Sequence, residues 1–306
     1  MKTQIHPCHP VRGFIREGAW WLVLVAGLLG RGTAASANAA IVPPDQIVAG
    51  KSYGEWTAAF GQWGLSIPWD AHHPWRDTTG SNAFEGQSGP VWFLGGGVAT
   101  RKIVVPDDKW LYVSMGGVGC STLEPDPFHG ENEEELRVCA ESFHIQELVC
   151  EVDGEPVPDL ERYQVITPMF PIELPALNVA GVQGGGSGQS VAAGVAVILE
   201  PLSPGSHTIY LHSTIAEDPA ASLQQLTYEI TVVSRPTLAI RPLPGTDRVE
   251  LSWPETAGYS LYQAGSCDPS ASWAAAAVDS SKSENGLRIV TATPGPAQRF
   301  YRLEFH

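Results

Sequence analysis

The chain has few basic residues for its length. Of its 306 residues, 18 are Lys or Arg and 33 are Asp or Glu, which gives a formal net charge of −15. A surface of this sign repels phosphate backbones and anionic lipid, so we expect no nucleic-acid partner. The acidic balance also suits divalent-cation binding, but solubility is its simpler explanation.

Short motifs of common enzyme classes are also lacking. The sequence contains no Cys-x-x-Cys pair, no His-Glu-x-x-His helix and no EF-hand loop. The stretch 86–89 is not a nucleophile elbow, because Pro90 stands where the second glycine of Gly-x-Ser-x-Gly should fall. The glycine-rich segment 181–189 lacks the Lys-Ser/Thr pair of a phosphate-binding loop, so we expect a flexible loop there. The sequence therefore implies no cofactor.

Long apolar runs are confined to the N-terminal region. A basic segment ending at Arg16 precedes the apolar residues 19–29, and small residues with two A-x-A patterns follow over 35–39. This order is typical of a secretory signal peptide, which we assign to residues 1–39. The apolar run, about 11 residues, is short for a bilayer span, although an uncleaved anchor is the alternative. We expect a secreted, periplasmic or cell-surface protein with no membrane span once the signal is removed.

Cysteines are few, and their context suggests one disulfide. Cys8 would leave with the signal, and the four that remain allow three pairings. We favour Cys120–Cys139, which closes a loop of about 20 residues and would stabilise the fold by roughly 3 kcal/mol. Cys150 has the context of a strand and is predicted to be a buried free thiol. Cys267 lies in the C-terminal part.

Proline and glycine, by contrast, are abundant, with 25 and 32 residues. Together with many short apolar runs they predict a mainly β protein. We expect a β-sandwich of the jelly-roll or immunoglobulin-like type with one or two short packed helices over residues 52–234. A small fibronectin type III-like β-sandwich would follow over 236–306, after a boundary at Arg235-Pro236. Residues 40–51 are assigned to a linker.

Two helices are predicted. Ser52 and Glu55 form a capping-box pattern, and the aromatic residues that follow fall on one face of a helix ending near Gly64. These are Tyr53, Trp56, Phe60 and Trp63, and core packing explains them better than a ligand platform. A second helix is expected over 131–143, with Leu136, Cys139, Ala140 and Phe143 on its apolar face. Its acidic first turn suits the helix dipole, with a calcium site as the alternative.

The strands begin with four large apolar residues, Val91–Leu94, which follow a polar, glycine-rich turn. Such a run predicts a strand buried on both faces, and we take it as the first central strand. Residues 101–105 and 110–115 are expected to pair as a hairpin, followed by a turn-rich excursion over 116–130. Further strands are expected over 147–152, 163–166, 172–174, 191–199, 207–211 and 226–233, and in the tail over 237–240, 248–253, 259–263, 287–292 and 299–305.

The loop 68–77 carries the candidate ligand-binding residues. Rigid tryptophans beside carboxylates can stack on sugar faces while polar groups bind hydroxyls. The candidates are Trp69, Trp75, Asp70, Asp77 and His72. Alternatively, both tryptophans close the end of the sandwich as core. His72-His73 could hold a metal with a neighbouring aspartate, but adjacent histidines in an extended loop point apart, so we predict no metal site.

Short segments spread over residues 52–233 form a further pattern. They are Tyr53–Trp56, Gln62-Trp63, Leu65–Pro68, Asp77–Gly80, Gly86–Leu94, Cys120–Thr122, Leu136–Ala140, Val152–Gly154 and Leu202–Ile209. The pattern resembles a family of uncharacterised exported bacterial proteins. Members often carry cysteines near Asn82 and before Val104, where this chain has Ala83 and Ile103, so both halves of such a pair would be missing together. The resemblance implies a fold and a compartment and supplies no catalytic residues.

The tail has a resemblance of its own. It rests on Val249–Pro254, Tyr259–Gln263, Trp273 and Phe300–Leu303. These segments are similar to the fibronectin type III-like modules that end many secreted bacterial proteins. Such a resemblance implies a role in spacing, stabilising or attachment.

Taken together, these features predict an exported, non-catalytic binding or structural protein. An extracellular carbohydrate or a cell-surface protein is the candidate partner. The alternative is a secreted hydrolase that acts on a polysaccharide through two carboxylates among Asp70, Asp77, Glu85 and Asp107. The geometry distinguishes them, because a glycosidase needs two carboxyls about 5–10 Å apart in one cleft.

Overall fold

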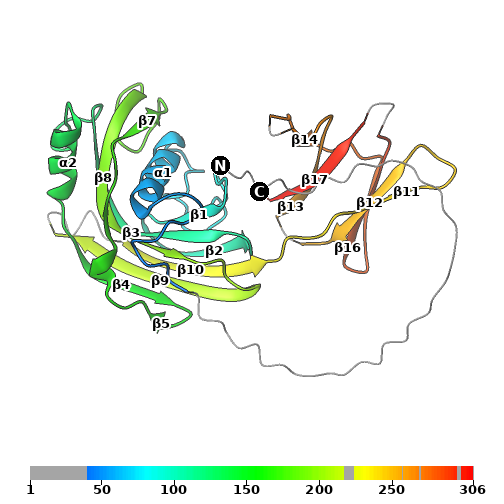
Figure 1. Ribbon diagram of the computed structural model, residues 1–306, viewed down its shortest axis with the longest axis horizontal. Coiled ribbons are helices and arrows are strands. Elements are labelled where there is room, and N and C mark those ends of the chain that lie inside the picture. Colours follow the sequence, from blue (N-terminus) through cyan, green and yellow to red (C-terminus); the bar gives the residue numbers. More distant parts are fainter. Residues whose placement is uncertain (1–39, 217–223, 257, 269, 295–297, 306) are drawn as a thin grey trace. The chain divides into compact units, whose positions relative to one another are not determined.

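The computed structural model describes residues 40–216, 224–256, 258–268, 270–294 and 298–305 (Figure 1). The predicted signal peptide lies outside these residues. The described chain forms two compact units, with the division between Arg235 and Pro236. Among the helices in these ranges, none has both the length and the apolar character needed to cross a membrane.

The larger unit contains two five-stranded sheets and two α-helices. The first sheet has the order β1-β3-β8-β6, with β7 also pairing with β8, and the second has the order β2-β10-β9-β4-β5. The first comprises β1 (Val91–Leu94), β3 (Trp110–Ser121), β6 (Gln164–Ile166), β7 (Phe170–Leu174) and β8 (Gly186–Leu199). The second comprises β2 (Val98–Pro106), β4 (Ile145–Val152), β5 (Glu155–Pro156), β9 (Gly205–Ile215) and β10 (Gln224–Val233). The predicted mainly β sandwich with short helices is confirmed.

Helix α1 (Tyr53–Ser66) begins at the predicted capping box. The Ser52 hydroxyl accepts the Glu55 N–H at 3.3 Å, and the Glu55 carboxylate accepts the Ser52 N–H at 2.8 Å. These bonds satisfy two donors that a helix start would otherwise leave free. The helix ends two residues before Pro68, which disfavours a helical residue before it.

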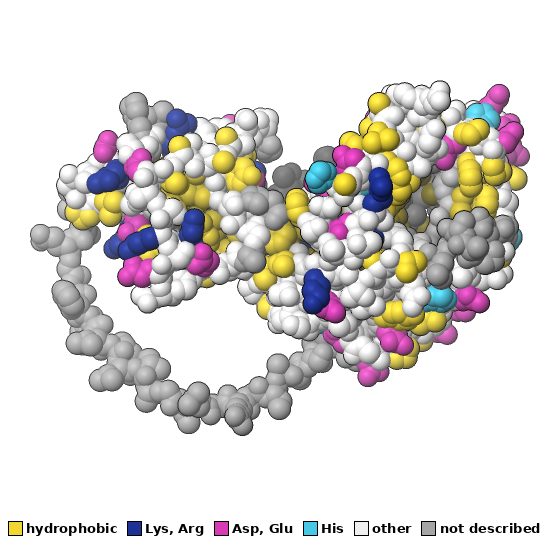
Figure 2. All heavy atoms as spheres, turned by 180° about the vertical axis from the view of Figure 1, so that it is seen from behind, with side chains coloured by type: hydrophobic (Ala, Val, Ile, Leu, Met, Phe, Trp, Pro, Cys, Tyr) yellow, Lys and Arg dark blue, Asp and Glu magenta, His cyan; other side chains and the backbone are white. Residues whose placement is uncertain are grey.

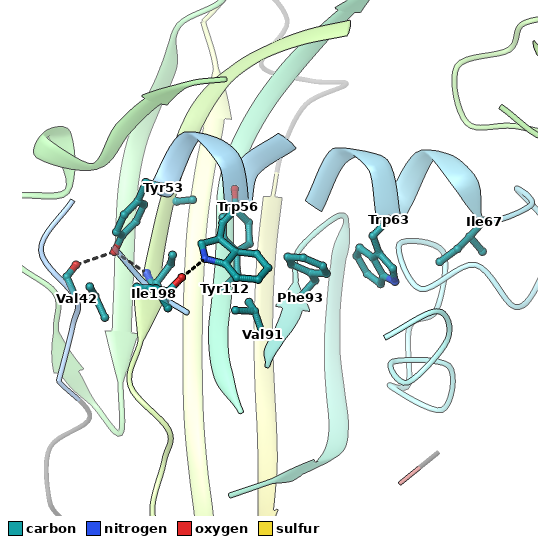
Figure 3. Packing of buried hydrophobic residues seen from close by; sticks show 11 residues of the cluster. Val42, Tyr53, Trp56, Trp63, Ile67, Val91, Phe93, Tyr112 and Ile198 are labelled. Carbon is teal, nitrogen blue, oxygen red and sulfur yellow. Dashed lines mark hydrogen bonds between the residues drawn. The ribbon is translucent and has the colours of Figure 1, made fainter. Parts of the chain in front are cut away.

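The aromatic stripe of α1 forms core, as predicted (Figure 3). Tyr53 and Trp56 point from the helix onto the first sheet, and both also use their polar atoms. The Tyr53 hydroxyl donates to Val42 O at 2.7 Å and accepts the Ile198 N–H at 2.9 Å. The Trp56 indole donates to Val48 O at 2.8 Å. Each ring therefore packs without burying an unpaired donor.

Residues 40–51 belong to the larger unit and are not the linker that the sequence predicts. Val42 donates its N–H to Ile198 O at 2.8 Å, and Ile41 forms a bridge with Leu199. Val42 and Val48 are only 4% and 2% exposed. The prediction is wrong because these scattered apolar residues have no periodicity of their own. They fill the core around the first half of α1.

Strand β1 lies at the edge of its sheet, so its predicted central position is wrong. It pairs in parallel with β3, as in Val91↔Trp110. It is buried on both faces, as predicted. Phe93 packs on the α1 cluster, and Trp92, being adjacent in a strand, points to the opposite face. The outer edge is occupied by the Gln87 amide, which donates to Phe93 O at 2.9 Å and accepts its N–H at 3.0 Å.

Strands β2 and β3 lie in different sheets, which contradicts the predicted hairpin. The turn at Asp107-Asp108 carries the chain from one sheet to the other, and β2 pairs in parallel with β10 instead. Alternation of apolar residues predicts a strand but does not show which strand it pairs with. Two consecutive strands can therefore be paired wrongly from the sequence.

The glycine-rich segments contain more strand than the sequence predicts. Strand β3 continues through Gly116, Gly117 and Gly119 to Ser121, and β8 begins at Gly186. A register shift between Ser114 and Gly116 allows the two strands to pair along this length. Because glycine has no side chain, these strand segments show no alternation of apolar and polar residues. Their composition is that of turns, so the sequence predicts turns there.

Helix α2 (Glu133–Glu141) lies on the opposite side of β8 from α1 (Figure 1). Asn132 caps it by accepting the Glu135 N–H at 3.1 Å. Leu136 and Ala140 are fully buried, which confirms the predicted apolar face. The predicted disulfide Cys120–Cys139 is confirmed and ties this helix to β3. Cys150 is a buried free thiol, as predicted, and burial raises the pKa of this thiol to about 12.

Two tight turns order the second sheet. Asp153 and Gly154 have φ values of 53° and 81°, the left-handed values that a two-residue hairpin turn between β4 and β5 requires. His207 Nδ1 lies 2.7 Å from the Asp153 carboxylate, and its Nε2 lies 2.8 Å from Ser203 O. His207 thus links the turn before β9 to the β4–β5 hairpin by hydrogen bonding.

The smaller unit is the predicted small β-sandwich, with every pairing antiparallel. One sheet contains β11 (Ala239–Pro242), β12 (Val249–Pro254), β15 (Ser280–Glu284) and β16 (Leu287–Ala292), and the other β13 (Tyr259–Ala264), β14 (Ala274–Ala275) and β17 (Phe300–Phe305). Leu251, Trp253, Val290 and Leu303 form its core. The sequence misses β15 because every residue of this polar strand is exposed.

Candidate functional site, a cleft beside helix α1

Trp75, one of the predicted ligand-binding residues, packs at the end of the core. Its ring centroid lies 5.4 Å from Phe60 and 6.2 Å from Trp63. Gly64 of α1 and Gly96 after β1 both lie against the indole, where a Cβ on either would overlap the ring. The two glycines thus create the slot that the indole occupies. For Trp75 the structure thus agrees with the alternative stated above, in which the tryptophans of this loop close the end of the sandwich as core.

The two adjacent histidines have different environments. His73 is fully buried; its Nδ1 accepts the Trp75 N–H at 3.1 Å, so its Nε2 carries the proton and donates to Gly64 O at 3.0 Å. Burial lowers the pKa of His73, which favours this neutral ring. The His72 side chain is 76% exposed and lies 3.5 Å from Asp70. Within the described ranges no three potential ligands gather as a metal site would require.

The other predicted residues of this loop have local partners. Trp69 is half-buried, donates its N–H to Leu177 O, and has the Arg76 guanidinium 5.5 Å from its ring centroid. Asp70 accepts the His72 N–H at 2.8 Å. The contacts of Trp69 with Arg76 and of Asp70 with His72 order the loop from within, and the Trp69 bond to Leu177 ties it to a distant segment.

Asp77 is buried, and its carboxylate is fully engaged. It accepts the Asn82 N–H at 2.7 Å, and the Thr79 N–H and hydroxyl at 2.8 Å each. Although burial by itself raises the pKa of Asp77, these hydrogen bonds and one from the Gly80 backbone outweigh it and lower the pKa. Asp77 is therefore held as an anion that organises the turn 77–82.

Arg101 holds this loop to both sheets, and the sequence does not single it out. Its side chain is buried and donates to Asp77 O at 2.7 Å, Gly95 O at 2.9 Å and Gly96 O at 2.7 Å. It also donates to the Tyr228 hydroxyl of β10 at 2.9 Å. A planar guanidinium can satisfy this many carbonyls at once, whereas an ammonium group cannot. Arg101 therefore fixes Gly96, one of the two glycines that Trp75 packs against.

A cleft of ≈ 340 Å³ lies between α1 and the glycine-rich part of the first sheet. Its apolar lining includes Phe60 and Leu65 of α1 together with Phe170 and Ala180, and the last two pack in one cluster with Leu65. Trp75 contributes to its lining near Ser114. The volume falls within the range of about 300–1,000 Å³ that is usual for small-molecule sites.

Glycines form much of the floor of this cleft. Gly117 and Gly194 face each other in the β3–β8 register, and a Cβ on Gly194 would overlap the Gly116 carbonyl. At Gly119, by contrast, a Cβ would have only ordinary contacts, 3.6 Å from Ser190 Oγ and 3.9 Å from Ala192 Cβ. The glycine at 194 is therefore required by the backbone, while the one at 119 leaves space that a side chain could fill.

Few polar groups face this cleft. Ser114, Gln224 and Glu124 lie among its lining residues, and none of the described lining residues is Lys, Arg or His. Gln224 Oε1 accepts the Gly96 N–H at 3.4 Å. Burial raises the pKa of Glu124, and the Ser121 hydroxyl, which donates to it at 2.8 Å, lowers the pKa to a smaller extent. An apolar pocket with one perturbed carboxyl is a functional-site candidate.

Among the predicted ligand-binding residues, the lining of the cleft includes Trp75 and lacks Trp69, Asp70, Asp77 and His72. Glu85 and Asp107 are not part of the lining either. The signal that could have located the site is the set of glycines inside β3 and β8. Glycine in a strand often marks close approach by a ligand or another backbone.

No family model and no curated protein match this chain. Among solved structures it is similar to an "I-band fragment I67-I69 from titin", with 8% sequence identity and a TM-score of 0.23. The match covers 66% of this chain and 60% of the fragment, so the chain spans less than two thirds of that fragment's length. The β-sandwich assignment rests on the sheets described above.

Proposed function

We propose that this protein is an exported, non-catalytic binding protein whose larger unit takes a small, largely apolar ligand in the cleft beside α1. The observation that carries the proposal is the cleft itself, ≈ 340 Å³ between aromatic walls and a glycine floor. Burying apolar ligand surface there would supply about 25 cal/mol per Å². Ser114 and Gln224 would orient the ligand through hydrogen bonds.

Binding is favoured over hydrolysis by the arrangement of the acids. Glu124 is the one carboxyl among the described lining residues of the cleft, while glycoside hydrolysis ordinarily uses two. Asp77 is already committed to the turn 77–82. Figure 2 shows Asp and Glu side chains scattered over the visible face rather than gathered in one patch, as expected for solvation.

Export is supported by two features. The disulfide Cys120–Cys139 is typical of oxidising compartments, and the sequence of residues 1–39 has the order of a secretory signal. In this proposal the smaller unit, a β-sandwich, acts as a spacer or attachment module. An extracellular carbohydrate or another cell-surface molecule would then present the group that enters the cleft.

The test is a saturation-transfer NMR screen of residues 40–306, which include every described residue. The panel contains small aromatic alcohols, alkyl alcohols, monosaccharides and disaccharides, and released sugar is assayed in parallel. Gly119→Leu fills the cleft where a side chain fits without backbone overlap. Gly265→Leu is the matched control, because it lies in the smaller unit where a Cβ would have one ordinary contact, 4.0 Å from an Arg299 nitrogen.

Binding of an apolar probe that is lost in Gly119→Leu and kept in Gly265→Leu would support the proposal. Binding that survives in both variants would place the site elsewhere and overturn it. Binding of saccharides alone, unaffected by Gly119→Leu, would favour the loop 68–77. Release of sugar would overturn the non-catalytic assignment.

A further inference from the structure

Glu124 lines two cavities. One is the cleft beside α1, and the other is an outer cavity of ≈ 590 Å³ between the loops 123–129 and 181–183. No other described residue lines both. A ligand whose body occupies the cleft would therefore meet this carboxyl where the apolar lining gives way to the outer cavity.

One of the two carboxylate oxygens of Glu124 is held by a hydrogen bond within the described chain. The buried Ser121 hydroxyl donates to Oε2 at 2.8 Å and also accepts the Glu124 N–H at 3.2 Å. Ser121 directly follows Cys120, whose disulfide ties this strand end to α2. Oε1 has no hydrogen-bond partner among the described residues. A half-buried carboxylate oxygen with a free lone pair favours an incoming N–H donor.

The charges around both cavities have one dominant sign. The cleft has Glu124 as its charged lining residue, and the outer cavity adds Asp126 and His129. Neither lining, as far as the chain is described, contains Lys or Arg. A carboxylate or phosphate on the ligand would thus meet no Lys or Arg among these residues and would lie near the like charge of Glu124 and Asp126, which is destabilising.

We infer that the ligand carries a positively charged amine or guanidine group beside its apolar body, and that Glu124 recognises this group. The inference rests on the proposed function and deepens it, because it assigns the class of ligand to the same cleft. The apolar body lies between Phe60 and the glycine floor. The charged group bonds to Oε1 at the boundary with the outer cavity.

Burial agrees with this role. It raises the pKa of Glu124, which means that the empty site stabilises the charged carboxylate poorly. A bound cation would offset this loss, so binding and ionisation of Glu124 favour each other. Asp126 and His129, which also face the outer cavity, would modulate the effect. Affinity for a cation should therefore rise with pH as Glu124 ionises.

The test uses three probes that share one apolar body and differ in the head group. They are 2-phenylethylamine, 2-phenylethanol and phenylacetate, titrated into residues 40–306 by calorimetry or ligand-observed NMR at pH 7. We expect the amine to bind about tenfold more tightly than the alcohol, the size of one charge-assisted hydrogen bond. Phenylacetate should bind more weakly than either.

Two variants separate the causes. Glu124→Gln keeps the shape and an acceptor for Ser121, and should remove the advantage of the amine while leaving 2-phenylethanol within about twofold. Glu134→Gln, an exposed acid on α2, is the matched control and should change nothing. Removal of the amine's advantage by Glu124→Gln alone would confirm the inference.

The possible failures are distinguishable. Equal affinity of all three probes, with loss of binding in Gly119→Leu, would overturn the charge assignment and keep the cleft as the site. An amine preference that persists in Glu124→Gln would overturn the role of Glu124. Binding of every probe in Gly119→Leu with wild-type affinity would overturn the proposed function itself.

Discussion

The face of the first sheet that α1 covers has two different halves. Side chains fill the space in one, which we call the packed half, and glycines line the other, which we call the bare half. Beside the first half of α1, Tyr53, Trp56 and Phe93 fill the space over the strands. Farther along β3 and β8, glycines replace side chains, and a cleft remains. The difference shows that the position of a binding site can depend on where side chains are absent. A helix that covers a sheet leaves a cavity wherever the facing strands supply nothing to fill it.

The largest expected effect lies in the packed half. Trp56→Ala removes a buried ring and its bond to Val48, and should lower the free energy of unfolding by about 3–5 kcal/mol. Chemical denaturation measures this value. Phe84, which is 43% exposed, is the aromatic control, and Phe84→Ala should cost less than about 1 kcal/mol. Equal losses in the two variants would contradict the core assignment.

The next effect concerns the disulfide at the far end of the bare half. Replacing both Cys120 and Cys139 by serine should lower stability by roughly 3 kcal/mol, because the bond closes a loop with a sequence separation of 19. It should also weaken binding of 2-phenylethylamine, because Ser121 and Glu124 come shortly after Cys120 in the chain. Unchanged probe binding in the folded variant would show that Glu124 is held without this bond.

A matched pair of substitutions sharpens the comparison within the glycine floor. Gly194→Ala places a Cβ against the Gly116 carbonyl and should cost about 1–3 kcal/mol. Gly119→Ala places the same group in ordinary van der Waals contact with Ser190 and Ala192 and should change stability by less than about 0.5 kcal/mol. Thermal unfolding of both variants measures the difference. A larger loss at 119 would mean that the floor is closed there.

The last comparison concerns two carboxyls, that of the buried Asp77 and that of the half-buried Glu124. The lowered pKa of Asp77 supplies stability that is present above its unfolded pKa of about 3.9 and is lost as pH falls through the folded value. The raised pKa of Glu124 has the opposite sign, since its contribution is present below the unfolded pKa of about 4.3 and is lost as pH rises.

These signs predict opposite results for two amide variants at pH 7. Asp77→Asn should destabilise by about 2 kcal/mol, because charge-assisted bonds are lost. Glu124→Gln should leave stability unchanged or slightly raised, and its advantage should vanish near pH 4. Denaturation of both variants at several pH values would reveal a reversal of either sign, which would contradict the environments described here.

How far the sequence predicts this structure depends on the type of signal. Caps and side-chain periodicity located α1, α2 and β10, because those signals are local. Pairing partners were not predictable in the same way, as β2 and β3 show, since a strand's pattern does not specify its neighbour. The packing of residues 40–51 depends on tertiary contacts of isolated valines.

The site was harder to predict than the fold. The loop 68–77 attracts attention because tryptophan, histidine and aspartate are conspicuous, yet Asp77 and His73 chiefly hold the loop together. The cleft depends on glycines, whose contribution is the absence of atoms. Gly117 and Gly194 become informative only when the register places them opposite each other.

The central claim is that the glycine floor beside α1 is where ligand binds. The most direct measurement is amide chemical-shift mapping of residues 40–306 on addition of 2-phenylethylamine. We predict saturable shifts at the amides of Gly117, Gly119 and Gly194, with little change at Val42 or Ile198 under the packed half. Shifts confined to residues 68–77, or no saturable shift at the three glycines, would contradict the account.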